Sequence, residues 1–250
     1  ALQRGQIPIG EIRLGIYGNE DPMYILAGLP FIAPDYSSAW LLKDVQMGYL
    51  QEKFGKKGLM ILYTSPWPGQ GFYTKSPVNS VADFKGKKLR IYSTATQQMG
   101  SMLGFNATIL PFAEIPQAFS TGLIEALFTS PQTGIDIQAW DNTKHFTYAG
   151  AIFSKNAVVV SKKAFNALSK DDQMNILAAA KKAEIRGWEM SAETTKKQID
   201  ILKKNGMSAK NAPDEVISKM KSIGLEMMKS WRSKASPEAN AVLDRYLSMR

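Results

Sequence analysis

The chain contains no cysteine among its 250 residues. Thiol catalysis, cysteine-rich zinc sites and disulfide bonds are therefore excluded together. It also has a single histidine, His145, so a Ser-His-Asp triad or a transition-metal site would have to be built around that residue. His145 lies in DNTKHFTY, with no serine in a nucleophile-elbow pattern beside it. We interpret it as a surface or packing residue and expect neither a metal ion nor a cofactor.

Long apolar stretches and nucleotide-binding motifs are missing as well. No apolar run approaches the roughly 18–20 residues that a membrane-spanning helix needs. The glycine motif GQG at 69–71 lacks its third glycine because Thr74 stands there, and no P-loop spacing occurs. The opening residues ALQRGQIPIGEI lack the basic start and apolar stretch of a signal peptide. They resemble the last turn of a helix closed by Gly5, so we expect upstream material to be absent from the chain.

What the chain does contain is typical of a soluble α/β protein. It is 44% hydrophobic and 21% charged, and its length suits one large domain or two lobes. The net charge of +9 comes from lysines scattered along the sequence, which we interpret as solvated helix faces. Nucleic-acid binding is the alternative. It would need a recognisable motif or aromatic residues interleaved with basic ones, and neither is present.

Strand and helix patterns alternate along most of the chain, which predicts sheets covered by helices and favours parallel strands. The apolar run at 59–65 predicts a buried strand, expected to be parallel. Ser37 and Ser38 are candidate caps for a helix at 40–54. Strand patterns occur at 7–18, 59–65, 89–92, 107–112, 123–130 and 145–161, and helical ones at 40–54, 95–103, 113–120 and 131–140.

A long helical pattern begins after Ser169 and continues to Lys204, where Asn205 and Gly206 form a C-terminal cap. Roughly 35 helical residues extend about 50 Å, which is longer than one small lobe requires. We therefore expect this helix to bridge two lobes. The Pro/Gly-containing stretch WPGQGFYT at 67–74 separates two strand patterns and is predicted to cross between the lobes.

The clearest functional signal is Arg90, in the strand pattern LRIY. Ser93 and Thr94 follow, where the strand ends and a helix begins, so free backbone N–H groups there favour an anion. The planar guanidinium of Arg90 matches a carboxylate with two parallel hydrogen bonds. An exposed strand arginine or a structural ion pair is the alternative interpretation, and the two hydroxyl residues also serve as helix caps.

Other candidates could complete a ligand site. Thr129 and Ser130 lie at a second strand-to-helix junction. Trp67 and Gln70, in the Pro/Gly stretch, could supply an aromatic wall and an amide, and Phe112 ends a strand pattern as either a core or a pocket residue. Two strand ends that carry hydroxyls across a cleft form a common type of ligand site.

Two motifs resemble the substrate-binding subunits of tripartite ATP-independent periplasmic (TRAP) transporters of the DctP type. The family patterns are TK.PI.S..DLKGLK.R and LGA.PV....E...AL.TG.VDG. This chain has TKSPVNSVADFKGKKLRIYST and LGFNATILPFAEIPQAFSTGLIEAL, and the likeness covers essentially its whole length. The first pattern is filled by Asp83, Lys85, Gly86, Lys88 and Arg90, and most of the second by Gly104, Pro111, Glu114, Ala118, Thr121, Gly122 and Glu125.

The resemblance implies an α/β fold with two lobes, each a sheet flanked by helices, joined by strands and the long helix. We expect lobe I to comprise residues 1–67 and 155–190, without the first strand–helix–strand of the family. Lobe II would comprise 68–154 and 191–250 with the C-terminal helices. The implied function is capture of a small organic carboxylate in the periplasm by lobe closure, without catalysis, and delivery to a sodium-driven membrane permease. An α/β enzyme acting on a carboxylate and a ligand-sensing module of the same fold are the alternatives.

In this family the arginine at the position of Arg90 usually clamps the ligand carboxylate. The resemblance also implies ligand contacts for Phe112, for Thr129 with Ser130, and for Asn156 as an amide donor. Tyr17 and Asn19, at the end of the first strand pattern, join the predicted set.

The departures from the family bear on the ligand. Gln70 stands where sialic-acid binders carry a second arginine, which argues against that ligand class. The apolar stretch that ends at Phe128 predicts an apolar wall. We therefore expect a monocarboxylate with an apolar, cyclic or aromatic remainder, and a keto acid or a pyroglutamate-like compound would also fit.

Overall fold

The computed structural model of the protein describes residues 1–250. A three-stranded sheet forms the centre of the first lobe. Its order is β1 (Ile9–Arg13), β8 (Lys155–Ser161) and β2 (Leu59–Pro66). Both pairings are antiparallel, so the expectation of a parallel β2 was wrong. An apolar run shows that a strand is buried on both faces. It does not show the direction of its neighbour, and here β8 returns between β1 and β2 from the other lobe.

A six-stranded sheet forms the second lobe. Its order is β5 (Asn106–Ile109), β4 (Lys88–Ile91), β6 (Ala126–Thr129), β3 (Gly71–Thr74), β7 (His145–Tyr148) and β9 (Ser208–Asn211). The strands β5, β4 and β6 are parallel, as the alternating patterns predicted, whereas β3 runs antiparallel to β6 and β7. The carboxyl ends of β4 and β6 therefore lie at one edge, which holds Arg90 and Thr129.

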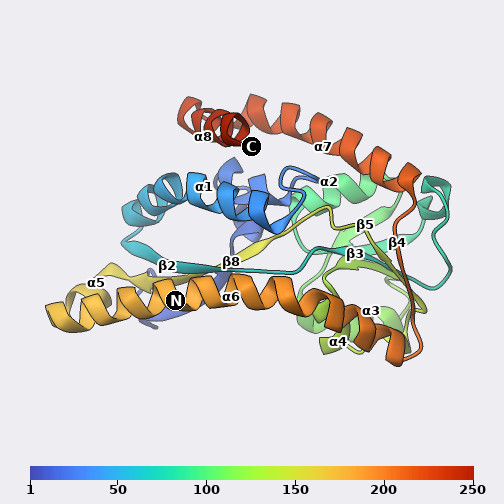
Figure 1. Ribbon diagram of the computed structural model, residues 1–250, viewed down its shortest axis with the longest axis horizontal. Coiled ribbons are helices and arrows are strands. Elements are labelled where there is room, and N and C mark those ends of the chain that lie inside the picture. Colours follow the sequence, from blue (N-terminus) through green and yellow to red (C-terminus); the bar gives the residue numbers. More distant parts are fainter.

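The two lobes are joined by two chain crossings and by the long helix. Residues 67–70 connect β2 to β3, and residues 149–154 connect β7 to β8. Helix α6 (Lys170–Lys204) contacts both β2 and β9 and runs along the lower edge of Figure 1 from one lobe to the other. The predicted lobe-spanning helix is thus confirmed. A Cβ at Gly71 would collide with the carbonyl oxygen of Thr147, so the first crossing needs glycine at this point.

Helices cover the outer faces of both sheets (Figure 1). Helix α1 begins at Tyr36, and its cap is Asp35, which accepts the N–H of Ser38 at 2.7 Å. Ser37 and Ser38 are therefore inside the helix and are not its caps. The cap of α6 is Ser169, as predicted. The α-helices other than α6 are α1 (Tyr36–Lys56), α2 (Thr94–Met102), α3 (Ile115–Ser120), α4 (Pro131–Asp136), α5 (Lys162–Asn166), α7 (Asp214–Lys234) and α8 (Pro237–Met249).

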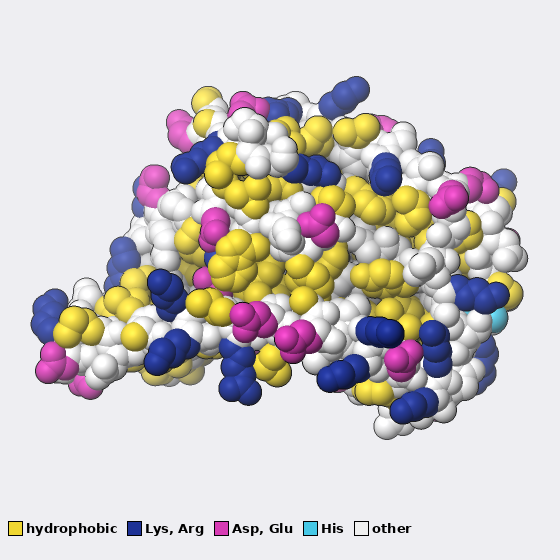
Figure 2. Space-filling model, in the orientation of Figure 1, with side chains coloured by type: hydrophobic (Ala, Val, Ile, Leu, Met, Phe, Trp, Pro, Cys, Tyr) yellow, Lys and Arg dark blue, Asp and Glu magenta, His cyan; other side chains and the backbone are white.

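The C-terminal helices extend over both lobes. Helix α8 packs on α1, and α7 contacts α2. The exact division of the chain between the lobes stays a prediction. Figure 2 shows Lys and Arg side chains spread over α6, α7 and α8 and mixed with acidic ones. None of the helices combines the length and the apolar composition that crossing a bilayer would need.

Buried aromatic rings fill the core of the second lobe. Phe72 packs against Phe84 and Phe128, with ring centroids 4.7 and 4.9 Å apart. Phe128 is completely buried in this cluster, so the wall that the sequence led us to expect around it is part of the core. These ring contacts hold β3 and β6, which carry Phe72 and Phe128, firmly in the core.

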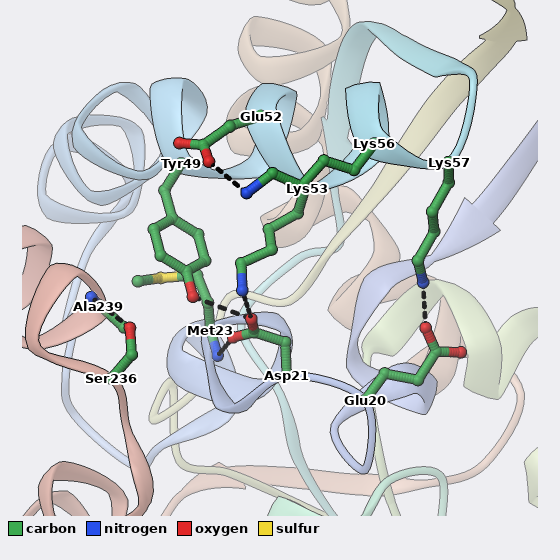
Figure 3. A network of polar contacts seen from close by, with 10 residues as sticks. All are labelled: Glu20, Asp21, Met23, Tyr49, Glu52, Lys53, Lys56, Lys57, Ser236 and Ala239. Carbon is green, nitrogen blue, oxygen red and sulfur yellow. Dashed lines mark hydrogen bonds and ion pairs between the residues drawn. The ribbon is translucent and has the colours of Figure 1, made fainter.

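Two buried ionisable groups of the first lobe have opposite surroundings. Asp21 accepts hydrogen bonds from the Met23 N–H and the Tyr49 hydroxyl and pairs with Lys53 at 2.8 Å (Figure 3). Burial raises the pKa of Asp21, but these donors outweigh it and hold the pKa below its ordinary value. Lys155 has no carboxylate in contact. Its ammonium donates to Gln46 Oε1 at 2.8 Å, and burial lowers its pKa to about 7.

Candidate functional site

A cleft of about 440 Å³ lies where the crossings meet the edges of the two sheets. Arg13 and Asn156 are cross-strand partners at its first-lobe side, and Arg90 and Thr129 lie at its second-lobe side. Its lining combines seven of the predicted site residues with six others. They are Arg13, Ile16, Trp67, Gln70, Arg90, Tyr92, Phe112, Thr129, Ser130, Thr133, Asp136, Ser154 and Asn156.

Arg90 is 1% exposed and carries no counter-ion. Its Nε and Nη2 donate to the carbonyl oxygen of Leu110 at 3.1 and 2.9 Å, which fixes the guanidinium plane and leaves Nη1 without a partner in the chain. Burial lowers the pKa of Arg90 to about 10, and the positive charge of Arg13 adds to this. The group remains protonated at neutral pH. A buried cation without a counter-ion favours an anion beside it.

Arg13 is a second cation of the cleft, and the sequence reasoning missed it. Its Nη2 donates to the carbonyl oxygen of Tyr92 at 3.2 Å. Its guanidinium carbon lies 5.0 Å from the centroid of the Tyr92 ring, and that of Arg90 lies 5.9 Å from the same centroid. The available signal was a cation between Ile12 and Leu14, within the first strand pattern. Nothing in the sequence indicated that β1 ends beside β4.

Tyr92 connects the floor of the cleft to the first crossing. Its hydroxyl donates to Gln70 Oε1, and Gln70 Nε2 donates to Ser154 Oγ at 3.0 Å. Burial raises the pKa of Tyr92 to about 12, so the hydroxyl stays protonated and remains a donor. Both ends of the Gln70 amide are therefore occupied. In this arrangement Gln70 holds the crossing loop and is not a free amide.

Trp67 and Asn156 form a second polar chain on the first-lobe side. The indole N–H of Trp67 donates to Asn156 Oδ1 at 3.0 Å, and Asn156 Nδ2 donates to Glu11 Oε1 at 2.9 Å. The Asn156 amide is thus engaged at both ends. What these residues offer the cleft is the aromatic surface of Trp67, held in place by the amide.

The second-lobe side supplies hydroxyls and an apolar lip. The hydroxyl of Thr129 makes no hydrogen bond within the chain, although the residue is 5% exposed. Ser130 is committed, because its Oγ accepts the N–H of Thr133 as the cap of α4. Phe112 begins a 3-10 turn beyond the strand that was expected to contain it, and is 49% exposed. Ile16 from the other lobe is equally exposed.

Three predicted residues lie outside this cleft. Ser93 is 4% exposed and caps α2, accepting the N–H of Thr96 at 3.2 Å. The chain turns into a 3-10 helix at Leu14–Tyr17, which keeps Ile16 at the cleft and places Tyr17 and Asn19 on other surfaces. Tyr17 lines a depression beside the N-terminal segment, and Asn19 lines one beside α2 and α7.

A larger cavity of about 690 Å³ lies between α6 and the strands β7 and β9. The face drawn in Figure 2 shows hydrophobic side chains gathered in the hollow above α6. The cations of this cavity are the exposed residues Lys196, Lys203 and Lys210. The smaller cleft is the better candidate, since its cations are held by hydrogen bonds at least partly out of water. No cluster of His, Asp and Glu suited to a metal ion occurs in the chain.

Two lobes, each with its own sheet, and a cationic cleft at their junction are the architecture of the two-lobed solute-binding proteins. The chain belongs to the family described as bacterial extracellular solute-binding protein, family 7 (DctP), whose sequence profile matches residues 1–234. The matched range extends well beyond the two motifs on both sides.

Solved structures of high similarity include two receptors from Bordetella pertussis. DctP7 is 38% identical with a TM-score of 0.95, over 98% of this chain and 81% of that chain. DctP6 is 37% identical with a TM-score of 0.96, over 99% of this chain and 82% of that chain. Both are described as extracytoplasmic solute receptors binding pyroglutamic acid.

Curated relatives are more distant. The 2,3-diketo-L-gulonate-binding periplasmic protein YiaO of Escherichia coli is 26% identical over 190 residues, which is 74% of this chain and 58% of the relative. A solute-binding protein of Chromohalobacter salexigens is 24% identical over 204 residues, 78% of this chain and 60% of the relative. The chain thus spans about three fifths of the length of these curated relatives.

Proposed function

We propose that this protein is a periplasmic solute receptor, not an enzyme, that captures a small organic carboxylate between its lobes. It then delivers the ligand to a sodium-driven TRAP permease. The observation that carries the proposal is Arg90, a buried guanidinium at the junction of the lobes with no carboxylate of the chain in contact. An anionic ligand would complete this group.

The geometry supports a carboxylate more than a diffuse anion. The Leu110 carbonyl holds the guanidinium plane of Arg90 in place. Ligand binding therefore costs little side-chain entropy at Arg90. The Thr129 hydroxyl offers one more donor on the same side. A ligand that contacts both lobes stabilises the closed arrangement by its greater affinity for it. Closure would also remove water from the ion pair and strengthen it.

Within this class we propose a cyclic carboxylate of the pyroglutamate type. Two receptors at 37–38% identity are described as binding pyroglutamic acid. The cleft of about 440 Å³ suits a small ligand, and Phe112 and Ile16 could cover the apolar edge of a ring. Gln70 stands where sialic-acid binders carry a second arginine, and its amide is already engaged by Tyr92 and Ser154. Both observations argue against a sialic acid as the ligand.

The enzyme alternative lacks support from the groups that line the cleft. Asp136 is its one carboxylate; it is exposed and accepts a hydrogen bond from Gln132 at 2.7 Å. A general acid–base pair next to the ligand would need a second titratable group of suitable pKa. The sensing alternative shares the same cleft and differs only in the partner protein.

A thermal-shift panel of small carboxylates tests the proposal. A ligand at a thousand times its Kd adds about 4 kcal/mol of stability, which corresponds to roughly 8–16 °C for a chain of this size. L-Pyroglutamate should produce such a shift, and its neutral carboxamide should not. Proton NMR of the mixture should show the compound unchanged after hours. Absence of any shift across the panel would contradict the proposed function, and turnover would favour the enzyme alternative.

A further inference from the structure

Arg13 has the features of an incomplete ligand contact. It is the last residue of β1, and its one hydrogen bond to protein goes from Nη2 to the Tyr92 carbonyl. Its Nε is buried without any partner. A guanidinium carries five N–H donors, and a buried N–H without an acceptor is unfavourable. Most of the donor capacity of Arg13 is therefore unused within the chain.

No carboxylate of the chain neutralises this group. Glu11 is the nearest acid along β1, two residues before Arg13 and on the same face of the strand, but it accepts the Asn156 amide and forms no salt bridge. None of the ion pairs in the structure includes Arg13 or Arg90. The two cations face the same Tyr92 ring.

The two arginines come from different lobes. Arg13 ends a strand of the three-stranded sheet, and Arg90 lies in the six-stranded sheet. The charge of Arg13 contributes to the lowered pKa of Arg90, so the two cations repel each other across the cleft. An acceptor beside each guanidinium would relieve the repulsion and satisfy the free N–H groups at the same time.

We propose that Arg13 is a second ligand-binding residue, which donates from lobe I to an uncharged carbonyl oxygen of the ligand while Arg90 holds its carboxylate. This inference rests on the proposed function and narrows it. The ligand class becomes carboxylates with a ring or chain carbonyl a few bonds from the carboxyl group. Arg13 thus selects ligands that carry an oxygen acceptor besides the carboxylate. Ligands whose other groups are all apolar are disfavoured.

The test pairs two ligands with two proteins. Cyclopentanecarboxylate and 3-oxocyclopentanecarboxylate differ only in the ring carbonyl. Arg13→Met removes the donors and keeps a side chain of similar length. A hydrogen bond from a charged group contributes about 1.5–3 kcal/mol, or roughly 10- to 150-fold in affinity. Calorimetry on the wild-type protein should show this preference for the oxo compound. In Arg13→Met the preference should fall to about twofold or less, while both compounds still bind through Arg90.

Arg186→Met is the matched control, because Arg186 is an exposed arginine of α6. It should keep the wild-type preference. An unchanged preference in Arg13→Met would overturn the role of Arg13 and leave the proposed function intact. If the wild-type protein binds neither compound, the inference about Arg13 fails, and the proposed function fails with it only if no carboxylate of the panel shifts the melting temperature. If Arg13→Met fails to fold, Arg13→Leu serves instead. It also has no hydrogen-bond donor and should lose the preference, and an unchanged preference would again overturn the role.

Discussion

Replacing Arg90 with methionine should remove ligand binding with little effect on the fold. Methionine is close to arginine in length but has no donors. Truncating one partner of a buried, hydrogen-bonded charge pair costs about 2–5 kcal/mol, or roughly 30- to several-thousand-fold in affinity. Arg90 is 1% exposed, so the upper half of this range applies. Calorimetry with L-pyroglutamate at fixed ionic strength measures it directly.

The stability of the empty variant should change little, because two effects oppose each other. Arg90→Met loses both hydrogen bonds to the Leu110 carbonyl, each worth about 1.5–3 kcal/mol. It also removes a buried cation that has no counter-ion, which is a gain of similar size. The ligand-induced thermal shift should vanish, while Arg186→Met keeps it. An Arg90→Met protein that is folded and binds within about threefold of the wild-type affinity would refute the reasoning.

Three further substitutions test other groups. Thr129→Val removes the free hydroxyl at the end of β6 and should weaken ligand binding by about 0.5–1.5 kcal/mol, with an unchanged melting temperature; equal affinity in calorimetry would exclude that contact. Lys155→Met should raise the melting temperature near pH 7. The folded-state pKa of Lys155, about 7, lies below the ordinary lysine value, so the stability of the wild-type protein rises with pH up to the unfolded-state pKa. The difference in melting temperature between Lys155→Met and the wild type should therefore shrink toward pH 10. Asp21→Asn removes the Lys53 ion pair and should cost about 1–2 kcal/mol in urea denaturation. Its folded-state pKa is lowered, so this stabilisation is present at neutral pH and is lost as pH falls through that pKa; a difference that persists in acid would contradict the assignment.

Local features of the fold could be predicted well from the sequence. Ser169 and the acidic residues after it indicated the start of α6, and its length indicated a helix that spans both lobes. The junction after Arg90 was also recognised, since a strand pattern and a cap residue are adjacent in the chain. Capping nevertheless competes with ligand binding for the same hydroxyl. Ser93 and Ser130 both use theirs to cap a helix, whereas the hydroxyl of Thr129 in the cleft stays free.

The features that sequence reasoning missed depend on contacts between distant segments. Arg13 and Tyr92 are 79 positions apart, so neither residue signals the other. The antiparallel direction of β2 depends on β8, which returns to the lobe almost a hundred residues later. The amides of Gln70 and Asn156 were proposed as ligand donors because their partners, Tyr92 with Ser154 and Trp67 with Glu11, become neighbours only in the folded chain.

The most direct test of the central claim is a crystal structure of the protein with L-pyroglutamate. Our account predicts the ligand in the cleft between the two sheets, with a carboxylate oxygen within hydrogen-bond distance of Arg90 Nη1. A carboxylate held by another cation, or a ligand in the cavity beside α6, would contradict it.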